Sequence, residues 1–125
     1  MQLVRALTEG GPVQGASTPS QTAITDTSAL ILSANPKRKG FTIQNTGTTV
    51  LKLNFGTTVV TQAVYHIALK GCTAANDGNG AIYSDDCWIG PVTAISSVAG
   101  GTCVIAEYTA SGPSWNQSAD WGGNY

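Results

Sequence analysis

Strict alternation of apolar and polar side chains in two short stretches constrains the fold of this chain more than any other feature of its sequence. Residues 41–45 read FTIQN and residues 51–55 read LKLNF. Successive side chains of a β-strand point to opposite faces of a sheet, so this period predicts strands with one buried and one solvated face. No stretch places apolar residues at helical spacing over three turns. We therefore expect an all-β protein.

Six further segments are short, rich in β-branched or apolar residues and bounded by turn residues, which is typical of strands. They cover residues 22–26, 29–33, 63–69, 81–84, 91–96 and 102–109. Short strands repeated about every ten residues are typical of a sandwich or a closed barrel. We expect a single antiparallel β-sandwich or jelly-roll-like barrel with extended N- and C-terminal arms, in which residues 46–48 and 98–101 connect hairpin partners.

The composition divides the chain into three parts. Residues 1–21 become rich in Gly, Pro, Ser, Thr and Gln after a short apolar start, and they predict an N-terminal arm. Residues 22–109 hold the patterned strands and predict the β-sandwich core. Residues 110–125 are again rich in Gly, Ser and Asn and predict an aromatic C-terminal arm. A chain of 125 residues is long enough for one packed domain.

Charge excludes several classes of partner. Charged residues make up only 10% of the chain, and the net charge is −1. A nucleic-acid binder needs a basic stripe that releases counterions, so we expect no nucleic-acid partner. No apolar run approaches the length of a membrane span, so we expect no membrane partner. A nearly neutral surface with few charges favours self-association, which predicts a homo-oligomer.

No constellation of catalytic or metal-binding residues stands out. The one histidine, His66, has no nucleophile or acid motif beside it, and we interpret it as a half-buried strand residue with a local hydrogen bond. Residues 76–80 read NDGNG but lack the acids and the closing Glu of a calcium loop. We interpret the basic residues 37–39 as a solvated turn. We therefore predict no enzyme, no catalytic residue, no metal and no cofactor.

The cysteines leave one question open. Their odd number, three, argues against a secreted disulfide framework, and no pair has zinc-site spacing. Cys72 and Cys87 bracket a loop, and a disulfide between them would stabilise the fold by about 3 kcal/mol in the loop-entropy model. A chain made in a cytoplasm starts reduced, however. Cys103 lies within an expected strand and fits a small core residue.

Large apolar side chains near both ends predict partner contacts. Trp115, Trp121 and Tyr125 lie in the Gly-rich C-terminal arm, and Leu3, Val4 and Leu7 lie in the N-terminal one. Terminal segments usually fray, whereas Trp and Tyr are favoured anchors at interfaces. We expect these six residues to bind a partner. The alternative is that the C-terminal arm folds back and covers its own sandwich.

Several motifs in residues 36–109 resemble small accessory virion proteins of tailed bacteriophages. The motifs, in chain order, are RKGFTIQNTG at 38–47, LNFG at 53–56, YHIAL at 65–69, GPVTAI at 90–95 and VIAEY at 104–108. This class includes capsid decoration (cement) proteins and head-fibre bases. The loop between the cysteines and the Trp-rich C-terminal arm depart from the pattern of the class.

The resemblance implies a structural role in a phage particle. The expected function is that of a capsid decoration protein, a homotrimer on the head surface that binds the major capsid protein and bridges its subunits. It would be made in the host cytoplasm and used in the virion. Two alternatives remain: a tail or fibre component, and a carbohydrate-binding β-sandwich module that stacks host glycans on Trp88, Trp115 or Trp121.

Overall fold

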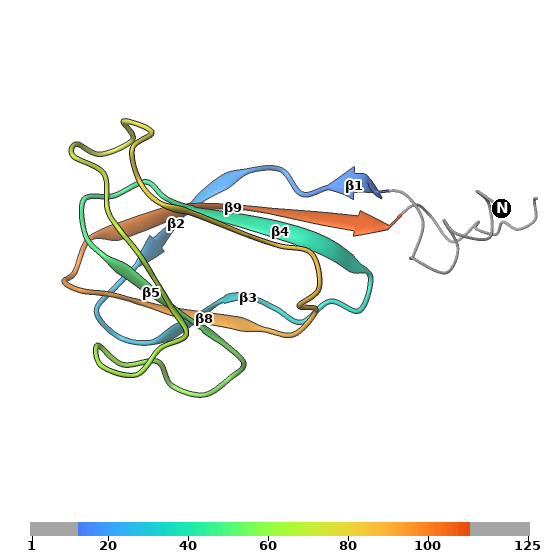
Figure 1. Cartoon of the computed structure of the whole chain (residues 1–125), viewed down its shortest axis with the longest axis horizontal. Coiled ribbons are helices and arrows are strands. Elements are labelled where there is room, and N and C mark those ends of the chain that lie inside the picture. Colours follow the sequence, from blue (N-terminus) through green and yellow to red (C-terminus); the bar gives the residue numbers. More distant parts are fainter. Residues whose placement is uncertain (1–12, 111–125) are drawn as a thin grey trace, which may run out of the picture.

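A computed structural model of the chain describes residues 13–110, which form two antiparallel sheets packed face to face (Figure 1). Sheet A consists of β1 (Val13–Ala16), β2 (Ser20–Ile24), β4 (Arg38–Asn45), β7 (Ile82–Asp85) and β9 (Gly101–Ala110). Sheet B consists of β3 (Ala29–Leu32), β5 (Leu51–Phe55), β6 (Ile67–Leu69) and β8 (Val92–Ser96). The predicted all-β antiparallel sandwich is confirmed. No helix that could cross a membrane occurs within residues 13–110.

The strand order mixes distant parts of the chain. Sheet A runs β1-β9-β4-β7, with β2 also paired to β9, and sheet B runs β3-β8-β5-β6. Neighbours in sequence mostly lie in opposite sheets, so the predicted hairpins across residues 46–48 and 98–101 are wrong. Both segments instead cross from one sheet to the other. Turn residues show where a chain reverses, but not whether the next strand pairs alongside or crosses to the facing sheet.

The core lies between the two sheets, and the predicted alternation places its side chains. Sheet A contributes Ile24, Phe41, Ile43, Cys103 and Ile105, and sheet B contributes Leu51, Leu53, Leu69, Val92 and Ala94. In β9 the buried Cys103 and Ile105 alternate with the half-buried Val104 and Ala106. The alternation of β9 and β4 therefore separates an inner from an outer face of sheet A.

Strand pairing begins inside the segment predicted as an N-terminal arm. Val13 pairs with Ala110, and Gln21 pairs with Val104. β1 and β2 thus line one side of the long strand β9, while β4 lines the other. Residues 13–21 show no alternation because backbone groups, not a periodic apolar face, pair them to the open side of β9. At the other discrepancy, residues 63–66 belong to a loop, and only Ile67–Leu69 form the predicted strand.

Candidate interaction surfaces

Both terminal segments leave the sandwich at the same end (Figure 1, right). Val13 at the start of β1 pairs with Ala110 at the end of β9, and Arg38 at the start of β4 pairs with Thr109. The basic turn at residues 37–39 therefore lies at this end as well. The predicted anchors lie outside the described residues: Leu3, Val4, Leu7, Trp115, Trp121 and Tyr125. The two predicted arms begin side by side.

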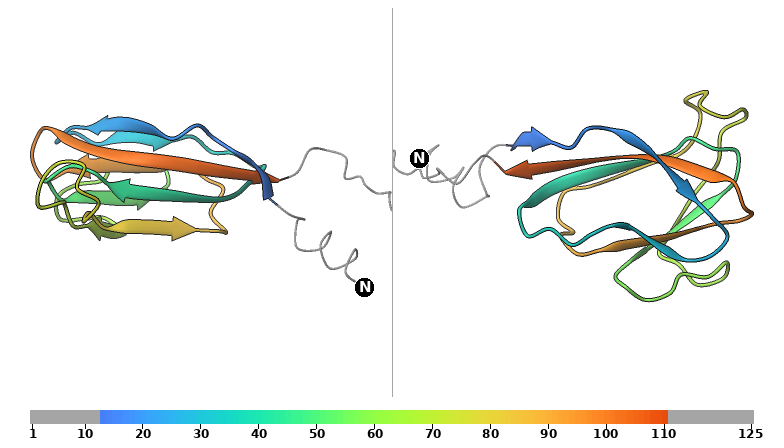
Figure 2. Two further views of the ribbon diagram at one scale, coloured as in Figure 1. Left: turned by 90° about the horizontal axis from the view of Figure 1, so that it is seen from above. Right: turned by 180° about the vertical axis from the view of Figure 1, so that it is seen from behind.

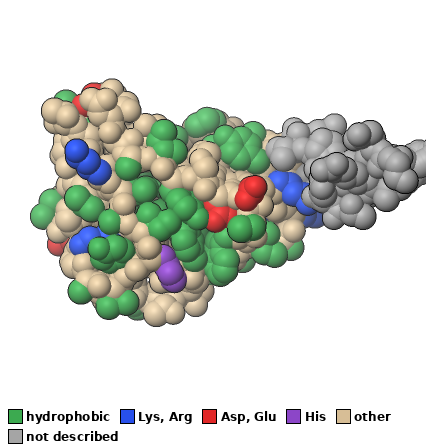
Figure 3. All heavy atoms as spheres, in the orientation of Figure 1, with side chains coloured by type: hydrophobic (Ala, Val, Ile, Leu, Met, Phe, Trp, Pro, Cys, Tyr) green, Lys and Arg blue, Asp and Glu red, His purple; other side chains and the backbone are tan. Residues whose placement is uncertain are grey.

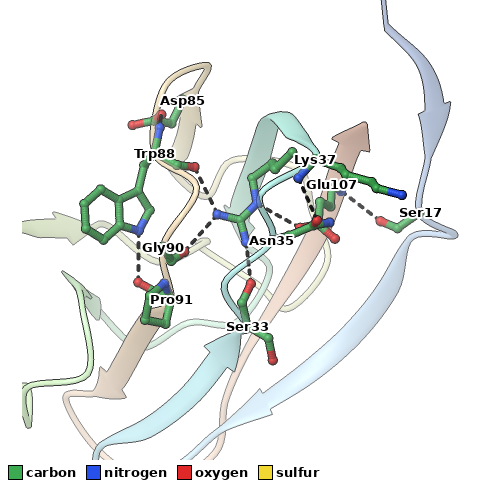
Figure 4. Close-up of polar contacts among 10 residues, drawn as sticks. Ser17, Ser33, Asn35, Lys37, Asp85, Trp88, Gly90, Pro91 and Glu107 are labelled. Atoms are coloured by element: carbon green, nitrogen blue, oxygen red, sulfur yellow. Dashed lines mark hydrogen bonds and ion pairs between the residues drawn. The ribbon is translucent and has the colours of Figure 1, made fainter. Parts of the chain in front are cut away.

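Arg38 is buried at this terminal end and binds several polar partners. Figure 4 labels those partners, Ser33, Trp88, Gly90 and Glu107. Arg38 Nε donates to the Glu107 carboxylate at 2.8 Å. Its terminal nitrogens donate to the carbonyls of Ser33, Trp88 and Gly90. Arg38 is only 3% exposed, so its part in the predicted solvated turn is wrong. Burial is tolerated because one carboxylate and three carbonyls satisfy the guanidinium donors.

The outer face of sheet A is uncharged. The register of the strands places on it Gln21 and Ala23 of β2, Thr42 and Gln44 of β4, Ile82 and Ser84 of β7, and Thr102, Val104, Ala106 and Tyr108 of β9. None of these side chains carries a charge. Figure 2 (left) looks onto these strands lying side by side. We call this surface the uncharged face.

Residues 56–66, which we call the covering loop, cover the outer face of sheet B over β8 (Figure 1, below β5 and β8). The carbonyl of Thr58 accepts a hydrogen bond from Thr93 Oγ1 at 3.2 Å, and Gln62 Nε2 donates to the Ser96 carbonyl at 2.8 Å. Val60 of the loop is only 1% exposed, and its N–H donates to Ser28 Oγ at 3.1 Å. Ile95 points outward from β8 but is only 6% exposed. All five residues of β8 are therefore buried.

Two asparagines of the motifs QNTG and LNFG have the same structural role. Asn45 Nδ2 donates to the carbonyl of Thr49 at 2.7 Å, and Asn54 Nδ2 donates to the carbonyl of Thr58 at 3.1 Å. Each side chain thus binds a carbonyl four residues along the chain. Asn45 is fully buried, and Asn54 is nearly so. These motif residues hold the loops that follow β4 and β5.

A cluster of aromatic rings closes the side of the sandwich between β5 and β7. Phe55 lies at its centre, with ring centroids 5.4 Å from His66, 5.3 Å from Tyr83 and 6.0 Å from Trp88. His66 is exposed and lies in the loop before β6, so its prediction as a half-buried strand residue is wrong. Its Nδ1 accepts a hydrogen bond from the Phe55 N–H at 3.1 Å. Figure 3 shows hydrophobic side chains around the one histidine.

Trp88 belongs to this cluster as a packed residue. Its indole N–H donates to the Pro91 carbonyl at 2.9 Å, and its ring lies against Gly90, where an added Cβ would come within 2.6 Å of it. A stacking platform for glycans needs a free ring face. The packing on Gly90 and Phe55 therefore leaves Trp88 poorly suited to that alternative, and Trp115 and Trp121 lie outside the described residues.

Asp85 organises the end of β7. Its carboxylate accepts hydrogen bonds from the Tyr83 hydroxyl and from the N–H groups of Cys87 and Trp88. Burial alone would raise the pKa of Asp85, but these hydrogen bonds outweigh it and hold the pKa below its usual value. Partial burial, together with the Asp85 carboxylate, raises the pKa of Tyr83 to about 12. Asp85, Asp86 and Cys87 could bring three ligand atoms together, yet Asp85 is already engaged in this turn.

The NDGNG segment forms a turn held by hydrogen bonds within residues 74–79 and by one to β2. Asp77 accepts hydrogen bonds from the N–H groups of Asn79 and Ala74, both at 2.8 Å, and these bonds lower its pKa. Asn76 adopts a φ of 61°, in the left-handed region that Asn tolerates. Its side-chain oxygen accepts a hydrogen bond from Gln21 at 2.9 Å. These contacts tie the turn to β2.

All three cysteines are free thiols in the structure. Cys72 is buried against the carbonyl of Asn45, and Cys87 is exposed near Asp85. The candidate bridge between Cys72 and Cys87 is therefore not formed here. The negative charge of Asp85 raises the pKa of Cys87, and burial raises that of Cys103 to about 11. Cys103 lies in the core, as predicted.

Comparison with known proteins adds little. No family model matches the chain, and no curated protein matches it. One similar solved structure comes from Bacillus endospore appendages, described as a novel family of disulfide-linked pili. It is 18% identical, with a TM-score of 0.46, over 82% of this chain and 94% of that chain. A likeness this distant says nothing about what this chain binds.

Proposed function

We propose that this chain is a non-enzymatic structural subunit of a tailed-phage particle. Within that class we propose a capsid decoration (cement) protein that binds the major capsid protein on the head surface, as a homotrimer, and bridges neighbouring capsid subunits. A tail or fibre component is the alternative. The resemblance of residues 36–109 to accessory virion proteins supports the class of function, and the geometry of the terminal end supports an anchoring role.

The observation that carries the proposal is the shared exit of both terminal segments. Val13 and Ala110 are paired, so residues 1–12 and 111–125 start from one end of a compact sandwich. If extended, twelve and fifteen residues could span up to about 40 and 50 Å, respectively. A domain with two such segments at one end can bind the capsid surface at two points and so bridge two neighbouring capsid subunits.

The network around Arg38 supports the same role. It ties the loops at Ser33 and Trp88 to Glu107 of β9, directly beside the exit of the chain. Removing one member of such a buried network typically costs about 3–5 kcal/mol. When both terminal segments are held on one support, a load would therefore meet an end of the sandwich that this network holds together. Lys37 is exposed there and could face an acidic partner surface.

The test adds purified protein to phage heads that lack it, followed by cryo-electron microscopy. We expect density at the junctions of capsid subunits, with the terminal end of the sandwich toward the shell. Density on the tail or fibres would instead support the alternative. Absence from every part of the particle, or specific binding on a glycan array, would contradict the proposal.

Truncated chains test the anchoring role separately. Because strand pairing begins at Val13 and ends at Ala110, deletions should stop at residue 12 and start at residue 111. We expect each deletion to keep the β-rich circular dichroism spectrum and to reduce binding to heads. Undiminished binding by both truncated chains would place the contact elsewhere on the sandwich.

A further inference from the structure

The uncharged face is a sheet surface that the described part of the chain covers only at one end, where Gln21 donates to Asn76 and Gln44 donates to the carbonyls of Gly78 and Gly80. Ile82 is 60% exposed on it, and Ala23 and Ser84 are also exposed. The middle of the face, around Thr42 and Ala106, lies between the turn at residues 76–80 and the paired ends of β1 and β9. On sheet B, by contrast, the covering loop buries the outward side chain of Ile95. An antiparallel sheet can present one face to solvent, and any protein cover over the middle of sheet A would come from outside residues 13–110.

The chemistry of the uncharged face favours a second copy of the same chain. At a two-fold interface each surface meets itself, so like charges would oppose one another. Thr42, Gln44 and Ser84 carry hydroxyl or amide groups that both donate and accept hydrogen bonds. Such groups are complementary to themselves, whereas a strongly charged partner would find no opposite charge on this face.

The edges of the sheets are less suited to association. β6 has only three residues, and a bulge interrupts the pairing of β3 between Leu30 and Leu32. Another irregularity interrupts β1 between Val13 and Gly15, and Asp85 and Asp86 lie at the end of β7. Short, bulged or charged edges resist edge-to-edge pairing. These edges therefore favour a contact through a face, and β2 (Ser20–Ile24) is the one regular edge strand among the described residues that competes with it.

The size of the face sets the strength of the contact. Four strands spaced about 4.8 Å apart, with about five residues each, give a footprint of roughly 350 Å². A stable specific interface buries about 800 Å² per partner. We therefore propose that a second copy covers the uncharged face, sheet A against sheet A, in a weak, concentration-dependent two-fold pair. This inference does not rest on the proposed function, and the pair is distinct from the trimer that the resemblance implies.

The test is sedimentation velocity of the full chain from about 5 to 500 μM, a range that brackets weak interfaces. We expect a monomer–dimer equilibrium for the wild type. Ala106→Lys places a charge near the centre of the face, beside Thr42, and should raise the dissociation constant at least tenfold. Leu30→Lys, a control on the outer side of sheet B at a position 54% exposed, should leave it unchanged.

A charge-swap experiment guards against misfolding. Ala106→Lys and Ala106→Glu should each be monomeric with a wild-type circular dichroism spectrum, and an equimolar mixture should recover the dimer. A wild type that stays monomeric at 500 μM would overturn the proposal. So would a dimer or trimer that Ala106→Lys leaves intact, or one that Leu30→Lys abolishes.

Discussion

The outer faces of the two sheets start from similar sequence patterns and end in different environments. The residues of β8 read VTAIS, and all five are buried because the covering loop lies over their outer side. The residues 41–45 of β4 read FTIQN, and Thr42 and Gln44 remain half-exposed. The strand pattern is alike, but a loop from elsewhere in the chain decides whether the outward side chains meet protein or solvent.

Because of this difference, the outer face of sheet B contributes to folding stability, and the outer face of sheet A is available for contact with a partner. Burying a Val or Ile side chain contributes about 1.5–3 kcal/mol, and the covering loop adds Val60 and Ile95 to the buried set. The uncharged face of sheet A adds nothing comparable until a partner covers it. Substitutions on the outer face of sheet B should therefore change the free energy of unfolding, whereas substitutions on the uncharged face should change association between copies.

Val60→Asp should have the largest effect, because it places an unpaired charge beneath the covering loop. We expect the free energy of unfolding to fall by about 3–5 kcal/mol, as for other uncompensated buried charges. The matched control Thr42→Asp, on the uncharged face, should cost about 1 kcal/mol or less. Urea denaturation measures both. Equal losses for the two variants would remove the distinction between the faces.

Asn54→Ala should have an intermediate effect. It removes the hydrogen bonds from Asn54 Nδ2 to the Thr58 carbonyl and to Thr93 Oγ1. We expect a loss of about 1–3 kcal/mol, the usual cost of unsatisfied buried polar groups. Amide hydrogen exchange should accelerate at Val60, whose N–H donates to Ser28. Protection there that equals the wild type would show that Asn54 does not hold the loop.

A smaller effect should come from the inner side of β7, whose outer side bears Ile82 and Ser84. Because the pKa of Tyr83 is raised from 10 to about 12, the unfolded chain loses this proton first. The stabilisation is fully present below pH 10 and is lost as the pH rises toward 12. Urea denaturation at several pH values should show a steeper decline for the wild type than for Tyr83→Phe. Parallel curves would contradict this prediction.

The smallest effect should be on the reactivity of one thiol. The pKa of Cys87 is raised chiefly by the charge of Asp85, so little thiolate forms at neutral pH. Asp85→Asn should therefore accelerate maleimide labelling of Cys87, and Asp86→Asn should do so less. Equal rates in all three chains would contradict this cause. If neither Cys72 nor Cys87 reacts with maleimide until the protein is reduced, the two cysteines form the candidate disulfide in solution.

The sequence was sufficient to predict strands wherever one face of a sheet is solvated. The alternation in residues 41–45, 51–55 and 102–109 reports which side chains enter the core, and the structure confirms it. The same reasoning could not find β1, whose residues pair through the backbone alone. It also could not place the covering loop, because no local pattern shows that Val60 will be buried or that its N–H will bind Ser28.

The polar features were harder to predict. Arg38 sits in a run of three basic residues, which favours solvent, and its carboxylate partner Glu107 lies 69 residues away. Only the pairing of β4 with β9 brings the two together. The candidate anchors near the chain ends, from Leu3 to Tyr125, stay predictions. For them the structure shows only the place from which both segments start.

The adjacency of the chain ends has a mechanical consequence. β1 runs antiparallel to β9, and its first residue pairs with the last residue of β9. A force that pulls the two ends apart would unzip this pair one bond at a time, starting at Val13 and Ala110. It would not shear all the bonds at once, so the domain would resist such tension poorly. If both ends are held on one common support, little force acts between β1 and β9. The sandwich can then tilt as a rigid body about its attached end.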